Sequence, residues 1–359
     1  MPRTTPPRPV DITQEFPELA PLARTAVRLH PRPGEPAVED SSVGGPLLWP
    51  HDEPWPTCPE HAGPWHVGYV PEEVRDSRRV LAAGWARAEG NSLTLTPQER
   101  EVVDRVGCTG RRIPQDGPVP LLAVAQLYAR DLPTAEAAEA AEAAEGAEGA
   151  EGAEGTEGGG RWPGPPEADL LQVLWCPFDH DEDCLPRVRL VWRRAADVGT
   201  PLSTPPGPSV IGDDNYLPDP CLLHPERVTE YPAPHELAEE LAERVRDWEE
   251  PRDYLYQDAL SVAPGWKLGG WGNWSFCDPW PMECPDCGGP VRPLLTVDSG
   301  EWDNERHWCP VEDEAAAMAP GVVHPQPQEP TQITIGRGYT MQVYSCERSF
   351  AHTPLQVMQ

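Results

Sequence analysis

The sequence predicts a β-rich α+β fold in which two similar antiparallel-sheet halves are joined by a helix. Three observations support this prediction. Short apolar or alternating runs are bounded by turn residues, the 359 residues include 48 Pro and 31 Gly, and stretches of the first part recur in the second part. Because Pro and Gly favour turns over long helices, most of the regular structure is expected to be short strands.

The expected elements follow from hydrophobic spacing. In residues 235–248 the apolar positions Leu237, Leu241, Val245 and Trp248 follow one another at steps of four, four and three residues, which places them on one helix face. We expect this face to pack on a sheet. Less regular helical patterns occur at residues 11–19 and 97–106. Strands are expected at residues 25–30, 119–128, 170–175, 188–192, 294–297, 332–335 and 339–344.

The repeat is clearest at a constant offset of 225 positions. Residues 43–49, Val-Gly-Gly-Pro-Leu-Leu-Trp, correspond to residues 268–274, Leu-Gly-Gly-Trp-Gly-Asn-Trp. The triplet Pro-Trp-Pro at residues 54–56 returns at residues 279–281. Tryptophans at matching positions indicate a shared packing role, although a ligand platform around Trp274 is the alternative.

Two later runs continue the repeat. Residues 118–124 match residues 290–297, with Leu121-Leu122 set against Leu294-Leu295. Residues 172–176, Gln-Val-Leu-Trp-Cys, match residues 342–346, Gln-Val-Tyr-Ser-Cys. We therefore predict an internal duplication of two similar antiparallel-sheet halves.

This repeat divides the chain into parts. Residues 1–230 form the first half, residues 231–250 contain the connecting helix, and residues 251–359 form the second half. Within the first half, residues 64–117 have no counterpart and are an elaboration. Residues 134–160 carry Glu at every third position and several Gly, so they offer no apolar helix face and are expected to form a disordered acidic insertion.

The formal net charge of −31 limits the partners that the protein can bind. Phosphate binding draws on Lys and Arg, so nucleic acid and anionic membranes are not expected partners, whereas a basic protein is compatible with the charge. The sequence contains neither an apolar N-terminal signal nor eighteen consecutive apolar residues. A cytoplasmic location is therefore expected, and the oligomeric state is left open.

Cysteine and histidine residues recur with the same repeat. In a reducing compartment, the ten cysteines are better interpreted as thiols or metal ligands than as disulfides. A pair with two intervening residues is followed in each half by a later Cys and His. We predict one zinc site of Cys58, His61, Cys176 and His180, and a second of Cys284, Cys287, Cys346 and His352.

The spacing suits tetrahedral zinc. A two-residue gap lets one turn direct two side chains at the same ion while the second pair arrives from another strand. If four protein ligands close each site, no position remains for a catalytic water, so both zinc ions are expected to be structural. The sequence leaves open mixed sites that combine the Cys58 and Cys284 turns, and the replacement of a ligand by Cys277 or Cys309.

The sequence lacks the common catalytic motifs, including the Gly-x-Ser-x-Gly elbow, the His-Glu-x-x-His helix and the Walker loop. We therefore predict a non-catalytic, zinc-stabilised binding protein. The alternative is a metal-dependent hydrolase in which the first site keeps an open position and His51 and Asp52 supply acid–base groups.

Several segments resemble a known family. The similarity covers most of the chain outside the acidic tract and lies in residues 43–50, 120–127, 132–133 and 267–270. These segments are similar to the DUF1963, or YwqG-like, family. The resemblance implies a bacterial intracellular protein with duplicated, β-rich architecture, no established reaction, and an immunity or toxin-binding role. The Cys and His pairs depart from the family pattern, so the zinc prediction depends on the spacing in this chain.

Overall fold

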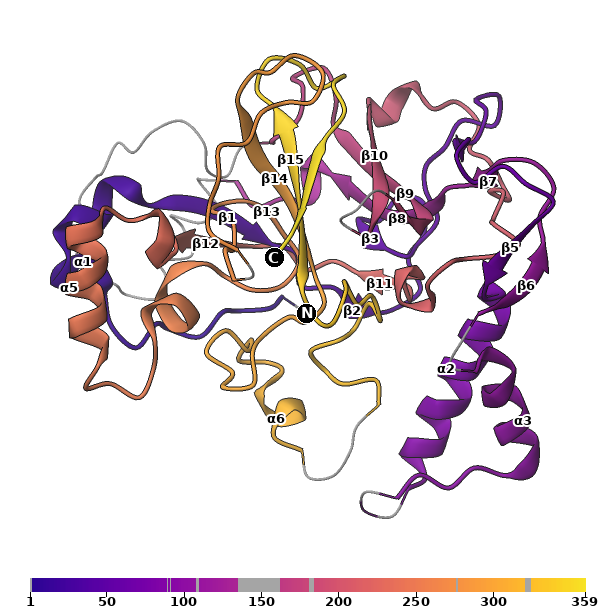
Figure 1. Cartoon of the computed structure of the whole chain (residues 1–359), viewed down its shortest axis with the longest axis horizontal. Helices are drawn as coiled ribbons and strands as arrows, with labels where there is room; N and C mark the ends of the chain where they lie inside the picture. The colour runs from indigo at the N-terminus through magenta and orange to yellow at the C-terminus, as the bar shows by residue number, and fades with distance from the viewer. Residues whose placement is uncertain are drawn as a thin grey trace.

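The computed structural model shows a strand-rich α+β fold with antiparallel sheets and few helices (Figure 1). It describes the chain except residues 1, 89, 91, 108–109, 135–161, 181–183, 276 and 320–323. The predicted acidic insertion, residues 134–160, therefore lies outside the described residues apart from Thr134. Among the described residues, no helix is both long enough and apolar enough to cross a membrane.

The first six-stranded sheet is built from residues before position 223. Its strand order is β10-β9-β8-β3-β11-β2, and each neighbouring pair is antiparallel. The strands are β2 (Arg32–Pro33), β3 (Ser42–Val43), β8 (Leu122–Tyr128), β9 (Leu170–His180), β10 (Leu185–Arg193) and β11 (Cys221–Leu222).

The second six-stranded sheet combines residues from both ends of the chain. Its order is β12-β1-β13-β14-β15-β16, again antiparallel throughout. The strands are β1 (Arg24–Arg28), β12 (Glu226–Glu230), β13 (Lys267–Gly269), β14 (Val291–Asp298), β15 (Thr340–Cys346) and β16 (Leu355–Met358). The predicted first part, residues 1–230, therefore contributes strands to both sheets.

Two small ribbons and the helices complete the fold. The ribbons pair β4 (Thr57–Cys58) with β7 (Val119–Pro120), and β5 (Trp65–Gly68) with β6 (Arg111–Pro114). The α-helices are α1 (Ile12–Glu15), α2 (Pro71–Ala86), α3 (Pro97–Val106), α5 (Glu239–Glu249) and α6 (Glu314–Ala317). The predicted elaboration, residues 64–117, contains α2 and α3, which form an arm that projects from the sheets (Figure 1).

Helix α5 begins later than the hydrophobic spacing predicts. A 3-10 turn over Pro234–Glu236 precedes it, and the helix starts at Glu239. Its apolar face, with Leu241 and Val245, packs against the N-terminal segment that includes Ile12 and Phe16. The expectation that this face packs on a sheet was wrong, because the N-terminal segment covers it.

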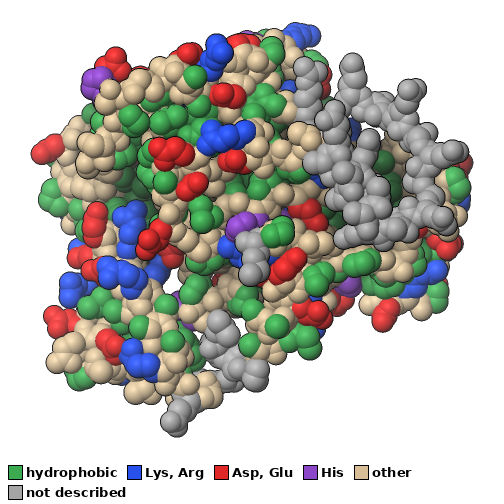
Figure 2. Space-filling model, turned by 180° about the vertical axis from the view of Figure 1, so that it is seen from behind, with side chains coloured by type: hydrophobic (Ala, Val, Ile, Leu, Met, Phe, Trp, Pro, Cys, Tyr) green, Lys and Arg blue, Asp and Glu red, His purple; other side chains and the backbone are tan. Residues whose placement is uncertain are grey.

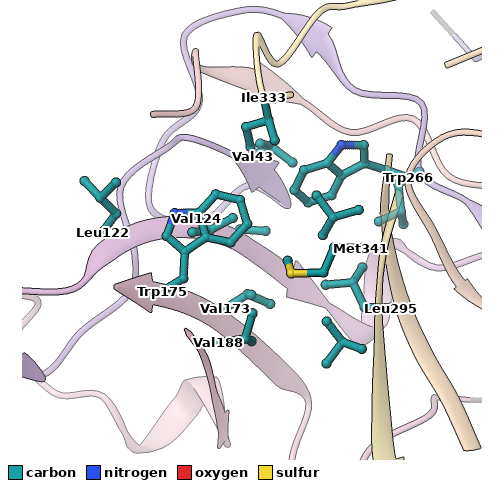
Figure 3. Packing of buried hydrophobic residues seen from close by; sticks show 14 of the residues in the cluster. Val43, Leu122, Val124, Val173, Trp175, Val188, Trp266, Leu295, Ile333 and Met341 are labelled. Carbon is teal, nitrogen blue, oxygen red and sulfur yellow. The ribbon is translucent and has the colours of Figure 1, made fainter. Parts of the chain in front are cut away.

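The two sheets share one hydrophobic core. Figure 3 shows Val124 and Trp175 of the first sheet facing the same interior as Leu295 and Met341 of the second. Trp266, between the sheets, is 1% exposed. Burial of apolar area is the main favourable term in folding, so each sheet depends on the other for stability.

In each sheet, four neighbouring strands are arranged in the order in which they follow one another along the chain. These strands are β3, β8, β9 and β10 in the first sheet and β13, β14, β15 and β16 in the second. Cross-strand partners are also alike. Val43 pairs with Ala125, and Leu268 pairs with Leu295. The match of Leu122 with Leu295 in the sequence was wrong by three positions, because Ala125 occupies the place of Leu295 in the strand pairing.

Side-chain contacts also correspond between the two sheets, at an offset of 225 positions for Leu48 and the tryptophans and of 170 positions for the glutamines. The Gln172 amide donates to Leu48 O at 2.9 Å, and the Gln342 amide donates to Asn273 O at 2.5 Å. The rings of Trp49 and Trp55 lie 5.0 Å apart, and those of Trp274 and Trp280 lie 5.3 Å apart. Trp274 is 3% exposed, which fits packing better than a ligand platform.

Candidate metal centres

The first group of predicted ligands lies between a turn and a long strand. Cys58 ends β4, and His61 follows it in the next turn. Cys176 and His180 both belong to β9. The pairing of β9 with β10 shifts register between these two residues, and both side chains reach the group, with Cys176 Sγ beside His61 and His180 Nε2 beside Cys58. Strand β9 therefore presents its thiol and its imidazole toward the turn that follows β4.

Donor atoms in the first group are spaced like the corners of a tetrahedron. His61 Nδ1 lies 3.5 Å from Cys58 Sγ and 3.4 Å from Cys176 Sγ. His180 Nε2 lies 3.7 Å from Cys58 Sγ, and all four donor atoms are within 4.8 Å of one another. Zinc bonds of about 2.3 Å to sulfur and about 2.0 Å to nitrogen would place such donors roughly 3.4 to 3.8 Å apart.

The surroundings of the first group hold its histidines in place. His180 Nδ1 lies 3.1 Å from Glu60 Oε2, and Glu60 also contacts the guanidinium of Arg187. The hydrogen bond from Arg187, followed by that from His180, lowers the pKa of Glu60. The ring of His61 stacks on Phe178 at a centroid distance of 4.6 Å. The carboxylate of Glu60 therefore orients His180 with Nε2 toward the sulfurs.

Burial disfavours the charged form of the thiols in the first group. Cys58 and Cys176 are both buried. Burial, followed by the proximity of Cys58, raises the pKa of Cys176. A bound cation removes this obstacle, because metal coordination deprotonates a thiol. Two buried sulfurs beside two imidazoles therefore form a donor set that could hold a metal ion.

The second group is assembled where β14 begins and β15 ends. Cys284 and Cys287 occupy a turn closed by hydrogen bonds from Cys284 N–H to Gly289 O and from Gly288 N–H to Cys284 O, each 2.8 Å. Gly288 has a φ of +60°, which glycine accepts without strain. Strand pairing of Val291 with Cys346 brings this turn beside the end of β15.

The donor distances in the second group are close to those in the first. His352 Nδ1 lies 3.4 Å from Cys284 Sγ and 3.3 Å from Cys346 Sγ. Cys287 Sγ and Cys346 Sγ are 3.7 Å apart, and the four donor atoms lie within 4.8 Å of one another. These distances also correspond to the edges of a zinc tetrahedron.

Backbone groups favour the thiolate in the second group. Arg348 N–H lies 3.3 Å from Cys346 Sγ. Burial opposes ionisation of Cys346, but hydrogen bonds from Arg348 N–H and His352 together lower the pKa of Cys346 to about 6. Asp286 Oδ2 accepts a hydrogen bond of 2.5 Å from Thr353 N–H. The turn that bears Cys284 is thereby tied to the segment that bears His352.

The eight predicted ligands thus lie in two groups of four, and each group contains the residues expected for one site. The mixed pairing of the Cys58 and Cys284 turns does not occur. Cys277 and Cys309 belong to neither group. The side chains of His51 and Asp52 are 61% and 78% exposed and also lie outside both groups.

Sequence reasoning missed the carboxylates that support the two groups. Glu60 and Asp286 are the third residues of the turns that begin at Cys58 and Cys284. Each contacts the segment that carries the histidine of its own group. A carboxylate at the same place in both turns was the available signal.

No protein-family model matches the chain, and no curated protein sequence matches it. The resemblance to the DUF1963 family therefore stays a prediction based on the segments named above.

Proposed function

We propose that each group of four ligands binds one Zn²⁺ ion and that both ions are structural. The observation that carries this proposal is the set of donor distances, 3.3 to 3.7 Å, in both groups. Sulfur and imidazole nitrogen are the donors that zinc prefers, whereas Mg²⁺ and Ca²⁺ prefer oxygen. Four protein donors complete each tetrahedron.

The closed coordination supports a scaffold role over hydrolysis. A catalytic zinc ion keeps one position for water or substrate. In both groups a fourth protein side chain is available for that position, which supports a closed site. His51 and Asp52 are exposed and belong to neither group, so the first site has no nearby acid–base pair from that turn.

We further infer that the two halves arose by duplication. This inference is supported by the common strand order, by the paired glutamine contacts and tryptophan pairs, and by the matching Cys and His positions. In this view each zinc ion binds the turn and the later Cys and His residues that correspond between the two halves. Structural zinc contributes roughly 10 kcal/mol of binding energy in small domains, comparable to the stability of a whole domain.

The proposed partner class for this scaffold is a basic protein. The net charge of −31 supports it, because opposite charge accelerates and orients association. Acidic and basic side chains are interspersed on the face shown in Figure 2. They pair within the α2–α3 arm, as in Arg87–Glu99, and between the arm and β6, as in Arg111–Glu73. The overall negative charge, and not a single acidic patch, therefore supports a basic partner.

Metal analysis of the purified protein tests the zinc proposal. Two zinc ions per chain, released only when the protein unfolds, are expected for two closed structural sites. A single ion that exchanges freely in the folded state, together with hydrolytic activity, would instead support the hydrolase alternative.

A further inference from the structure

The two proposed zinc sites differ in how well their sulfurs are protected. Of the five ligand cysteines, Cys58, Cys176, Cys284 and Cys346 are buried, and Cys287 is partly exposed. The first group holds two thiols, and the second holds three. An oxidant in solution can therefore reach a sulfur of the second group directly.

A second thiol stands beside the exposed one. Cys287 Sγ and Cys346 Sγ are 3.7 Å apart, and a disulfide requires about 2.05 Å between sulfurs. Cys287 is followed by Gly288 and Gly289, so the turn that carries it has the backbone freedom needed for a small movement. Cys346 is held at the end of β15 and can act as the resolving thiol.

We propose that the second site is an oxidation site at which a hydroperoxide forms a Cys287–Cys346 disulfide and releases zinc. This inference rests on the zinc-binding role proposed above. The Cys287 thiolate attacks the outer peroxide oxygen, the S–O bond forms as the O–O bond breaks, and the leaving alkoxide or hydroxide takes up a proton from solvent to become an alcohol or water. The Cys346 thiolate then attacks the sulfenic sulfur and expels hydroxide, which takes up a proton. Two thiolates are oxidised by two electrons, and the peroxide is reduced.

Zinc loses two of its four ligands in this step. The remaining pair, Cys284 and His352, leaves half of the coordination positions to water, and such a site binds zinc far more weakly. In the first group the sulfurs of Cys58 and Cys176 are buried, and the other two ligands are imidazoles. The first site is therefore expected to keep its ion under the same treatment.

Release of zinc should also loosen a contact between the sheets. Phe350 lies between the ligands Cys346 and His352, and its ring packs edge-to-face on Trp192 of β10 at 5.4 Å. This contact joins the β15–β16 connection to the first sheet. Oxidation is expected to expose the connection, so trypsin should cut after Arg348 faster in the oxidised protein.

The test uses the zinc-loaded full chain and hydrogen peroxide as the probe. Released zinc is measured with a chromogenic chelator, and total zinc is measured after denaturation. One of two ions should be released, and dithiothreitol with added zinc should restore it. Mass spectrometry should find the tryptic peptide of residues 268–306 linked to that of residues 338–348 through Cys287 and Cys346.

Variants separate the exposed ligand from an exposed cysteine elsewhere. Cys287→His keeps four donors and should hold both ions in peroxide. Cys184→Ser changes an exposed cysteine outside both groups and should release one ion, as the unmodified protein does. If Cys287→His fails to fold, the disulfide map of the unmodified chain still decides whether peroxide links Cys287 to Cys346.

The possible failures are distinguishable. Absence of zinc before treatment would contradict the zinc-binding role itself. Two zinc ions with no peroxide-dependent release, with release of both ions at one rate, or with a disulfide that omits Cys287 would overturn the oxidation site and leave the zinc-binding role intact.

Discussion

Glu60 and Asp286 are carboxylates at the same position of two short turns, and both stabilise the segment that carries a histidine. Glu60 contacts His180 directly, and Asp286 accepts a hydrogen bond from the residue after His352. A carboxylate on the free nitrogen of a metal-bound imidazole orients the ring and increases its basicity. These two residues should therefore influence zinc affinity without touching the ion.

Replacing Glu60 should weaken the first site selectively. In Glu60→Gln, zinc affinity of the first site is expected to fall about 10- to 100-fold, the usual effect of losing such a carboxylate. Competition with a calibrated chelator measures it. Asp286→Asn is the matched control and should leave the first site unchanged. Equal affinities for Glu60→Gln and the unmodified protein would show that Glu60 does not support the metal.

A buried carboxyl in the second sheet should make stability depend on pH. Burial raises the pKa of Asp298 to about 6, although hydrogen bonds from Gly265 N–H and Gly300 N–H favour the carboxylate. The unfolded value is about 3.9. The folded protein therefore binds the proton more tightly, and this group's favourable contribution is present below about pH 4 and is lost as the pH rises through about 6.

The variant Asp298→Asn removes this dependence. Relative to the variant, the unmodified protein should lose up to about 3 kcal/mol of unfolding free energy between pH 4 and pH 6, from a shift of roughly two pKa units. Urea unfolding at several pH values measures the difference. A difference that does not vary over this range, or that grows with pH in the opposite direction, would contradict the account.

At the scale of elements, the helix α5 depends on one apolar face. Leu241 is 8% exposed and packs in the cluster formed with the N-terminal segment. Leu241→Ala should lower the free energy of unfolding by about 2 to 4 kcal/mol, measured by urea titration. Zinc content should stay unchanged, because this cluster contains none of the ligands. Glu243→Ala, at an exposed position of the same helix, should change it by less than about 0.5 kcal/mol.

Strong local patterns predicted several elements well. Residues 339–344 and 188–192 were expected as strands and lie within or overlap β15 and β10. Residues 119–128 form two strands, because the N–H of Leu121, which lies between them, donates a hydrogen bond to Pro56 O. Residues 332–335 form no strand and contribute only a bridge between Ile335 and Tyr339. Local spacing does not encode such long-range hydrogen bonds.

The candidate sites were predictable because spacing within a turn is local. Cys284 and Cys287 can be recognised as a ligand pair because two residues separate them and because Cys58 and His61 have the same spacing in the other half. The supporting contact between Glu60 and Arg187 could not be recognised from the sequence, because it joins residues that are far apart along the chain. Only the pairing of β10 with β9 brings Arg187 beside the first group.

The whole molecule is held together by a core that both sheets line. A defect in one zinc site should therefore weaken the complete fold and not only one half. Cooperative unfolding is expected when the parts share their buried surface. This expectation can be tested with a ligand variant of either group.

In Cys284→Ser, one zinc ion should be lost and the melting temperature should fall, while calorimetry still records one transition. The reason is that Cys284 is a buried ligand of the second group, whereas the core is common. Cys277→Ser, outside both groups, is the control and should keep two ions. Full zinc content with an unchanged melting temperature in Cys284→Ser would refute the second assignment, and two separate transitions would refute the common core.

X-ray absorption at the zinc edge of the purified, zinc-loaded protein tests the central claim most directly. Five cysteines and three histidines supply the two groups, so the average ion should have four ligands, with sulfur at about 2.3 Å and nitrogen at about 2.0 Å in a ratio of five to three. A coordination shell that contains water oxygen, or more than four ligands, would contradict two closed structural sites.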